Sequence, residues 1–183
     1  MFDILSLGIG PLIVICIRLL VPLLIFRWPL FGGIAAAFAD LIDVVLTTLI
    51  GQGDFTNANY SYIDKALDTY FLAIMLIVSL KWEMLAKKTC IALFAIRTVG
   101  VVLFEMSGIR MLLFFFPNLF LLFYLFWAAR NRFFPGFVLT TKKLTVILIV
   151  LLIPKLIQEY LLHIVEVHPW EFLNAHLFHV GKG

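Results

Sequence analysis

Six long apolar stretches occupy most of the chain, and they limit its possible folds more than any other feature of the sequence. Their approximate limits are 10–26, 30–50, 62–80, 89–104, 111–129 and 144–163. A helix of about 20 mainly apolar residues spans the hydrocarbon core of a bilayer, and a helix satisfies its own backbone hydrogen bonds there. The sequence therefore predicts an all-α polytopic membrane protein, a six-transmembrane-helix bundle in a single domain over residues 1–183.

The composition agrees with this interpretation. Hydrophobic residues make up 63% of the chain, charged residues only 14%, and the mean hydropathy is +1.09, whereas an ordinary soluble domain has about 25% charged residues. The net charge of +3 comes from short basic clusters between the apolar stretches. Such clusters are expected beside membrane spans, so we do not expect nucleic acid as a partner.

The basic residues also predict the orientation in the membrane. Three alternate loops contain them, while the loop 51–61 has no Lys or Arg; the basic positions are Arg27, Lys81, Lys87, Lys88, Arg130, Arg132, Lys142 and Lys143. Cytoplasmic loops carry an excess of Lys and Arg, so we expect both termini to lie outside. We expect the membrane to be the cytoplasmic membrane of a bacterium. The tail after His163 is too short and too polar to span, and it predicts a short interfacial C-terminal helix.

Small residues and prolines predict details of the packing. Glycine and alanine dominate positions 32–39 of the second stretch, which would let a neighbouring helix approach closely. Pro29 follows Arg27 and Trp28 and fits the first turn of the second helix, giving a tight helical hairpin. Pro117 and Pro154 lie inside the fifth and sixth stretches and predict kinks there.

Charged residues at bilayer depth are the strongest functional signal. Inserting one costs about 3 kcal/mol or more, so such residues normally face a polar interior. With a rise of about 1.5 Å per residue, the residues near the midplane are Arg18, Asp40, Arg97, Asn118 and Lys155. Those nearer the outer face are Asp43, Asp68 and Glu159, and those at the outer rim include Asp64, Lys65, Glu105, Arg110 and His163. This pattern predicts a polar central cavity open to the outer face.

Helical spacing indicates that these side chains converge. Asp40 and Asp43 are three residues apart, Asp64 and Asp68 are four apart, and Lys155, Glu159 and His163 repeat every four residues. Residues so spaced share one face of a helix. The candidate ligand-binding residues are Arg18, Asp40, Asp43, Asp68, Arg97, Asn118, Lys155, Glu159 and His163.

Three functions are compatible with this pattern. The first is binding or transport of a small charged species, meaning a proton, a cation or a small anionic solute, through the charged cavity. The second is a membrane-embedded metal-dependent enzyme acting on a lipid or phosphate substrate, in which a divalent cation is held by Asp40, Asp43, Asp64 and Asp68. The third is a non-catalytic subunit of a larger membrane complex, or an oligomer, in which the charges form structural ion pairs. No catalytic residue and no other cofactor is assigned.

Overall fold

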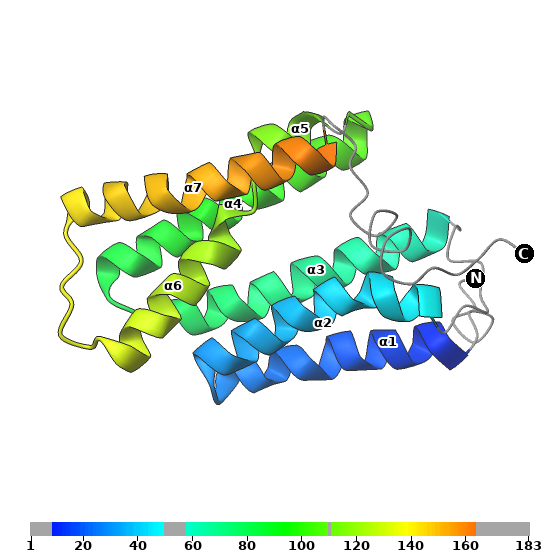
Figure 1. Cartoon of the computed structure of the whole chain (residues 1–183), viewed down its shortest axis with the longest axis horizontal. Helices are drawn as coiled ribbons and strands as arrows, with labels where there is room; N and C mark the ends of the chain where they lie inside the picture. Colours follow the sequence, from blue (N-terminus) through cyan, green and yellow to red (C-terminus); the bar gives the residue numbers. More distant parts are fainter. Residues whose placement is uncertain (1–8, 50–57, 110, 164–183) are drawn as a thin grey trace, which may run out of the picture. The chain divides into compact units, whose positions relative to one another are not determined.

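The computed structural model describes residues 9–49, 58–109 and 111–163, and all secondary structure in these ranges is helical (Figure 1). The helices are α1 (Ile9–Leu20), the 3-10 helix η2 (Val21–Phe26), α2 (Pro29–Leu49), α3 (Ala58–Ser79), α4 (Met84–Ser107), α5 (Met111–Phe115), α6 (Leu119–Phe133) and α7 (Thr141–His163). The all-α prediction is therefore confirmed for the described residues. The predicted C-terminal helix after His163 lies outside them.

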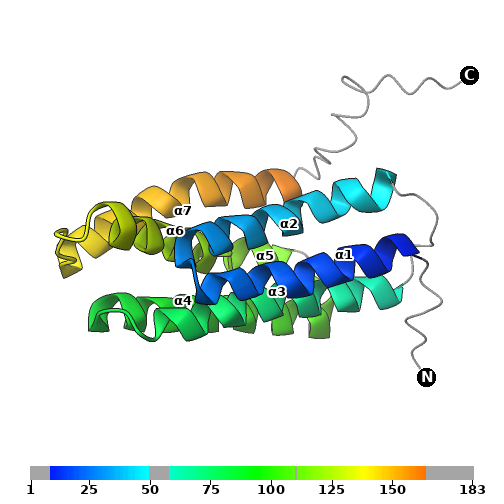
Figure 2. The ribbon, with the colours of Figure 1, turned by 90° about the horizontal axis from the view of Figure 1, so that it is seen from below.

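The described part of the chain forms two compact units. The first contains the described residues of 1–94 and 120–140, and the second those of 95–119 and 141–183. In the first unit α1, η2, α2 and α3 pack together, and they run side by side in two perpendicular views (Figures 1 and 2). In the second unit α5 packs against α7.

The hairpin between η2 and α2 forms as the sequence predicts. The N–H groups of Arg27 and Trp28 both donate to the carbonyl oxygen of Leu24, at 3.1 and 2.8 Å, and Pro29 is the first residue of α2. Proline fits the first turn because its missing N–H would have no partner there. The chain therefore reverses within two residues and lays α2 back against η2.

Glycines on α2 allow this close packing. A Cβ atom at Gly32 would meet the backbone of Leu24 and Ile25, and a Cβ atom at Gly33 would lie 3.0 Å from the side chain of Leu125 and 3.2 Å from that of Met75. The prediction that small residues let neighbouring helices approach is confirmed at these positions. The core beside them is aromatic, with Phe120, Phe123, Tyr124 and Trp127 fully buried.

The fifth apolar stretch is not one continuous helix. α5 ends at Phe115 and α6 begins at Leu119, because Pro117 has no N–H to continue the backbone hydrogen bonds of the preceding turn. The predicted interruption at Pro117 is thus present as a break between two helices. α7, in contrast, continues as an α-helix through Pro154.

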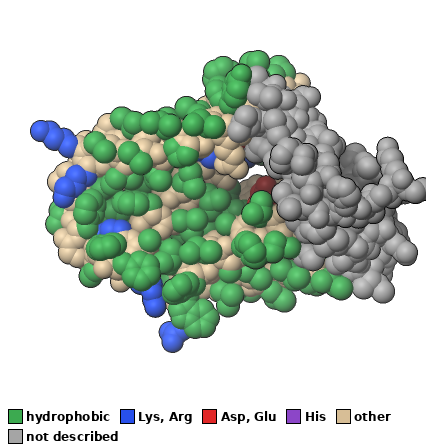
Figure 3. All heavy atoms as spheres, in the orientation of Figure 1, with side chains coloured by type: hydrophobic (Ala, Val, Ile, Leu, Met, Phe, Trp, Pro, Cys, Tyr) green, Lys and Arg blue, Asp and Glu red, His purple; other side chains and the backbone are tan. Residues whose placement is uncertain are grey.

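Within the described residues, α4 is the one helix that is long and apolar enough to cross a membrane by length and composition. Leu12–Phe26 and Pro29–Ile42 are apolar but shorter, while α6 has only 15 residues because of the break at Pro117. Among the described residues, the face shown in Figure 3 exposes many hydrophobic side chains and few charged ones.

Candidate functional site

Arg18 on α1 lies at the centre of the most highly charged contact in the described structure. Its side chain is only 3% exposed, although an arginine is almost never buried without a partner. One terminal nitrogen, Nη1, donates to Asp64, and the other, Nη2, donates to Asp40 and Asp68. We name these four residues the Arg18 cluster; they join α1, α2 and α3.

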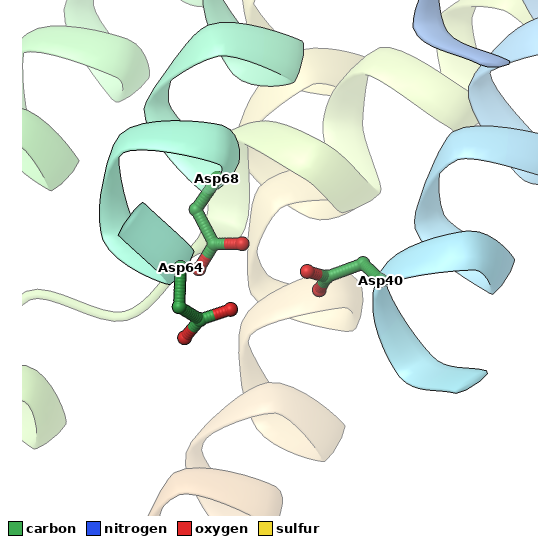
Figure 4. Close-up of side chains that lie close together, drawn as sticks. All are labelled: Asp40, Asp64 and Asp68. Atoms are coloured by element: carbon green, nitrogen blue, oxygen red, sulfur yellow. The ribbon is translucent and has the colours of Figure 1, made fainter. Parts of the chain in front are cut away.

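The three aspartates face one another. Asp64 and Asp68 point from α3 toward Asp40 on α2 (Figure 4), and a carboxylate oxygen of each lies within 4.8 Å of the others. The spacing of four residues between Asp64 and Asp68 places both on one face of α3, as the sequence predicts. Since a fork of guanidinium N–H groups suits carboxylates well, one arginine can join all three.

The charges in the Arg18 cluster do not balance. Three carboxylates face one guanidinium, so with all four groups ionised the net charge is 1 − 3 = −2. The aspartate side chains are 37%, 41% and 39% exposed, whereas Arg18 is 3% exposed. Negative charges at this separation repel one another. A further positive charge that reaches the exposed side of the aspartates would therefore stabilise the cluster.

A backbone contact next to Arg18 was not expected from the sequence. The hydroxyl of Tyr70 on α3 donates to the carbonyl oxygen of Leu19 at 3.1 Å. That carbonyl lies three residues before Pro22, which has no N–H to donate to it in a 3-10 turn. The presence of Pro22 inside an apolar stretch is the sequence signal that could have indicated a free carbonyl here.

The structure brings together part of the predicted site. Arg18, Asp40 and Asp68 meet as expected, and Asp64 joins them although its estimated depth put it at the outer rim. The side chains of Asp43 and His163, two further candidates, lie outside the described residues. The long arginine side chain explains why Asp64 and Asp40, at different estimated depths, share one partner.

The predicted metal ligands Asp40, Asp64 and Asp68 are close enough to hold one cation. In the described structure the positive charge among them is the guanidinium of Arg18, which contacts all three. Hard cations such as Mg²⁺ and Ca²⁺ prefer carboxylate oxygens, so the ligand chemistry fits such a metal. A metal would have to share these oxygens with Arg18 or displace it.

The remaining candidates belong to the second unit. Arg97 on α4 donates to the carbonyl oxygen of Phe116 at 3.2 Å, next to the break at Pro117. Asn118 is half-buried and precedes the first residue of α6, a helix-capping position that favours Asn. A Cβ atom at Gly100 would overlap the side chain of Phe116, so α4 packs tightly against this break.

Lys155 and Glu159 form an ion pair within α7. The Nζ atom of Lys155 lies 2.9 Å from a carboxylate oxygen of Glu159, and the two side chains are 13% and 5% exposed. Lys155 also donates to the side-chain oxygen of Gln158 at 3.0 Å. The predicted helical spacing thus yields a local pair, which neutralises both charges.

No known protein family, curated protein or solved structure matches this chain. Evidence on its function therefore comes from its own side chains, and among the described residues the Arg18 cluster has the largest excess of charge.

Proposed function

We propose that this protein is an integral membrane protein that binds or transports a small cation or a proton at the Arg18 cluster. The main observation in support of this proposal is that three half-exposed aspartates from two helices surround one buried arginine. The excess of negative charge attracts a positive species, and the exposed side of each carboxylate offers it access. Polar groups of this kind inside spans are typical of ion and proton pathways.

The surroundings of Arg97 and Lys155, two partly buried cations, favour a positive ligand over an anionic one. Arg97 donates to a backbone carbonyl, and Lys155 is paired with Glu159. Both therefore already use part of their hydrogen-bonding capacity on the protein itself, whereas the aspartates of the Arg18 cluster exceed their partner in charge. The binding of a small anionic solute is accordingly the less favoured form of this proposal.

The proposed membrane placement has six spans, with both termini outside, in the cytoplasmic membrane of a bacterium. Its support is the series of apolar helices, the exposed hydrophobic side chains along them, and the basic clusters in alternate loops. On α7, for example, Val146, Ile149, Val150, Ile153 and Ile157 are each more than half exposed. Such side chains are unfavourable in water and suit lipid.

Cysteine labelling tests this placement. In a background with Cys16 and Cys90 replaced by Ala, single cysteines are introduced at Gly53 and Gly136. A membrane-impermeant thiol reagent added to intact cells should label the first and not the second. Labelling of the cysteine at position 136 in intact cells would contradict the orientation.

Ion flux tests the function. The purified protein is placed in liposomes, and the movement of H⁺, Na⁺, K⁺ and Mg²⁺ is measured for the wild type, Asp40→Asn and Asp68→Asn. Glu83→Gln is the matched control, because Glu83 is an exposed acid outside the cluster. We expect flux of one of these ions above that of empty liposomes, lost in both Asn variants and retained in Glu83→Gln.

Three other results would contradict this proposal. Flux that is unchanged by both Asn variants would place the pathway elsewhere in the molecule. Folded protein without flux, and without stabilisation by any of these cations, would favour a non-catalytic subunit. Stabilisation by Mg²⁺ alone, without transport, would favour the metal-dependent enzyme.

A further inference from the structure

A second polar site lies in the first unit, at a pocket formed where three turns or helix ends meet. Its volume is about 230 Å³, and its lining includes Arg27, Trp28, Trp82, Asn131 and Arg132. These residues come from the turn between η2 and α2, the turn between α3 and α4, and the last part of α6. None of them belongs to the Arg18 cluster.

The two arginines of this pocket carry uncompensated positive charge. Both are exposed, and within the described residues neither forms an ion pair or a hydrogen bond through its side chain. The guanidinium of Arg132 lies 4.7 Å from the ring centre of Phe31, which holds it against α2. Stacking of this kind orients a guanidinium while leaving its N–H groups available.

The neighbouring Arg130 differs from Arg27 and Arg132 in that its side chain forms hydrogen bonds within the protein. It lies over the ring of Trp127 at 4.6 Å and donates to the carbonyl oxygen of Phe137 and, at 2.8 Å, to the side-chain oxygen of Asn131. Both terminal nitrogens of Arg130 are therefore used inside the protein, while its buried Nε has no hydrogen-bond partner among the described residues. The same bond occupies the oxygen of Asn131, so the amide NH₂ of Asn131 remains as a donor at the pocket.

The pocket thus combines several hydrogen-bond donors with aromatic walls. Trp28 is 50% exposed, and α2 begins at Pro29, so that the partial positive charge of a helix N-terminus adds to that of the arginines. Tryptophans favour the boundary between lipid and water, and all of these residues lie by the basic loops that we place on the cytoplasmic side. Basic pockets in that position suit anionic lipid headgroups.

We infer that this pocket binds the phosphate group of an anionic phospholipid headgroup at the cytoplasmic surface. A pocket for a drug-sized ligand has at least about 300 Å³, whereas this one has about 230 Å³ and matches a smaller group. Arg27 and Arg132 contact the phosphate oxygens, Asn131 donates a further hydrogen bond, and Trp28 and Trp82 flank the start of the acyl chains. The inference rests on the proposed membrane placement but not on cation binding at the Arg18 cluster.

The test uses the full-length protein in a neutral detergent, with lipid retention measured by native mass spectrometry. The probes are phosphatidylglycerol, phosphatidylcholine and inorganic phosphate. We expect preferential retention of phosphatidylglycerol, and a loss of affinity of about tenfold or more for Arg27→Gln and for Arg132→Gln, since hydrogen bonds to charged groups are typically worth that much. The control is Lys88→Gln with Lys142→Gln, which removes two exposed cationic side chains outside the pocket and should leave retention unchanged.

Three results would overturn the inference. Equal retention of phosphatidylcholine would remove the role of headgroup charge, and equal loss in the control variant would reduce the effect to overall charge. Inorganic phosphate that binds as tightly as the lipid, and competes with it, would make this a site for a soluble anion. Circular dichroism of each lipid-free variant separates a loss of lipid from a loss of fold, and cysteine labelling separates it from a wrong membrane placement.

Discussion

Replacing Arg18 by Met should strongly destabilise this protein. Methionine keeps much of the apolar stem and removes the guanidinium, which contacts Asp40, Asp64 and Asp68. The three carboxylates would then face one another within 4.8 Å without the positive charge between them. The helices α1, α2 and α3 would lose a contact that joins all three.

The burial of Arg18 and the exposure of the aspartates set the expected loss in the free energy of unfolding. Removing one member of a buried ion pair typically costs about 3–5 kcal/mol, and the Arg18 side chain is only 3% exposed. The aspartates, however, remain 37–41% exposed, so water would solvate part of the charge left behind. We therefore expect a loss of about 3 kcal/mol in the free energy of unfolding, at the low end of the range for buried pairs.

The assay is reversible unfolding of the purified protein in mixed micelles of a neutral detergent and SDS. Lys88→Met is the matched control, because Lys88 is exposed and a surface substitution usually changes stability by about 0.5 kcal/mol or less. Combining Arg18→Met with Asp40→Asn and Asp68→Asn should recover most of the loss, since two of the stranded charges are then gone. A loss below about 1 kcal/mol for Arg18→Met, or no recovery in the combined variant, would refute this reasoning.

Three further predictions use the same unfolding assay. Gly32→Ala should lose about 1–3 kcal/mol because its Cβ would overlap the backbone of the preceding hairpin, whereas Gly136→Ala, with open space around it, should change little; equal effects would contradict the packing. Arg97→Met should lose about 1–3 kcal/mol by leaving a backbone carbonyl without its donor, and wild-type stability would argue against that bond. Lys155→Met should lower the free energy of unfolding by about 3 kcal/mol, because it removes the ion pair that Lys155 forms with the buried Glu159. Most of this loss should return when both residues are Met; no return would exclude a structural pair.

Much of the helical layout could be predicted from hydropathy alone. The stretch 10–26 is helical over 9–26, and 30–50 is helical over 29–49. The helices in 84–107 and 141–163 extend beyond the predicted 89–104 and 144–163, because hydropathy marks the apolar part of a helix while its backbone bonds continue into the charged ends. The division of the fifth stretch into two helices follows from Pro117, but hydropathy alone does not indicate how many residues around a proline leave the helix.

The candidate site could be predicted only in part. The estimated depths and the helical periodicity identified Arg18, Asp40 and Asp68 as members of one polar group, because depth and periodicity depend only on the spacing of residues along a single helix. They could not assign partners, because the partner of a long side chain depends on how helices pack. Arg18 therefore reaches Asp64, and Lys155 pairs within its own helix rather than with a residue of another span.

The central claim is that the aspartates of the Arg18 cluster exchange a cation or a proton. Infrared difference spectroscopy of the purified protein observes this directly, because protonated carboxyl, free carboxylate and cation-bound carboxylate groups absorb at different frequencies. Spectra of the wild type, Asp40→Asn and Asp68→Asn are recorded while pH and the concentrations of Na⁺, K⁺ and Mg²⁺ are varied, with Glu83→Gln as the control.

We predict a carboxyl signal in the wild type that changes with pH or with one of these cations, persists in Glu83→Gln and disappears in Asp40→Asn and Asp68→Asn. Spectral changes that are the same in the folded wild type, Asp40→Asn and Asp68→Asn under every condition would contradict the account. The aspartates would then be permanently paired with Arg18, and the cluster would serve only to hold the helices together.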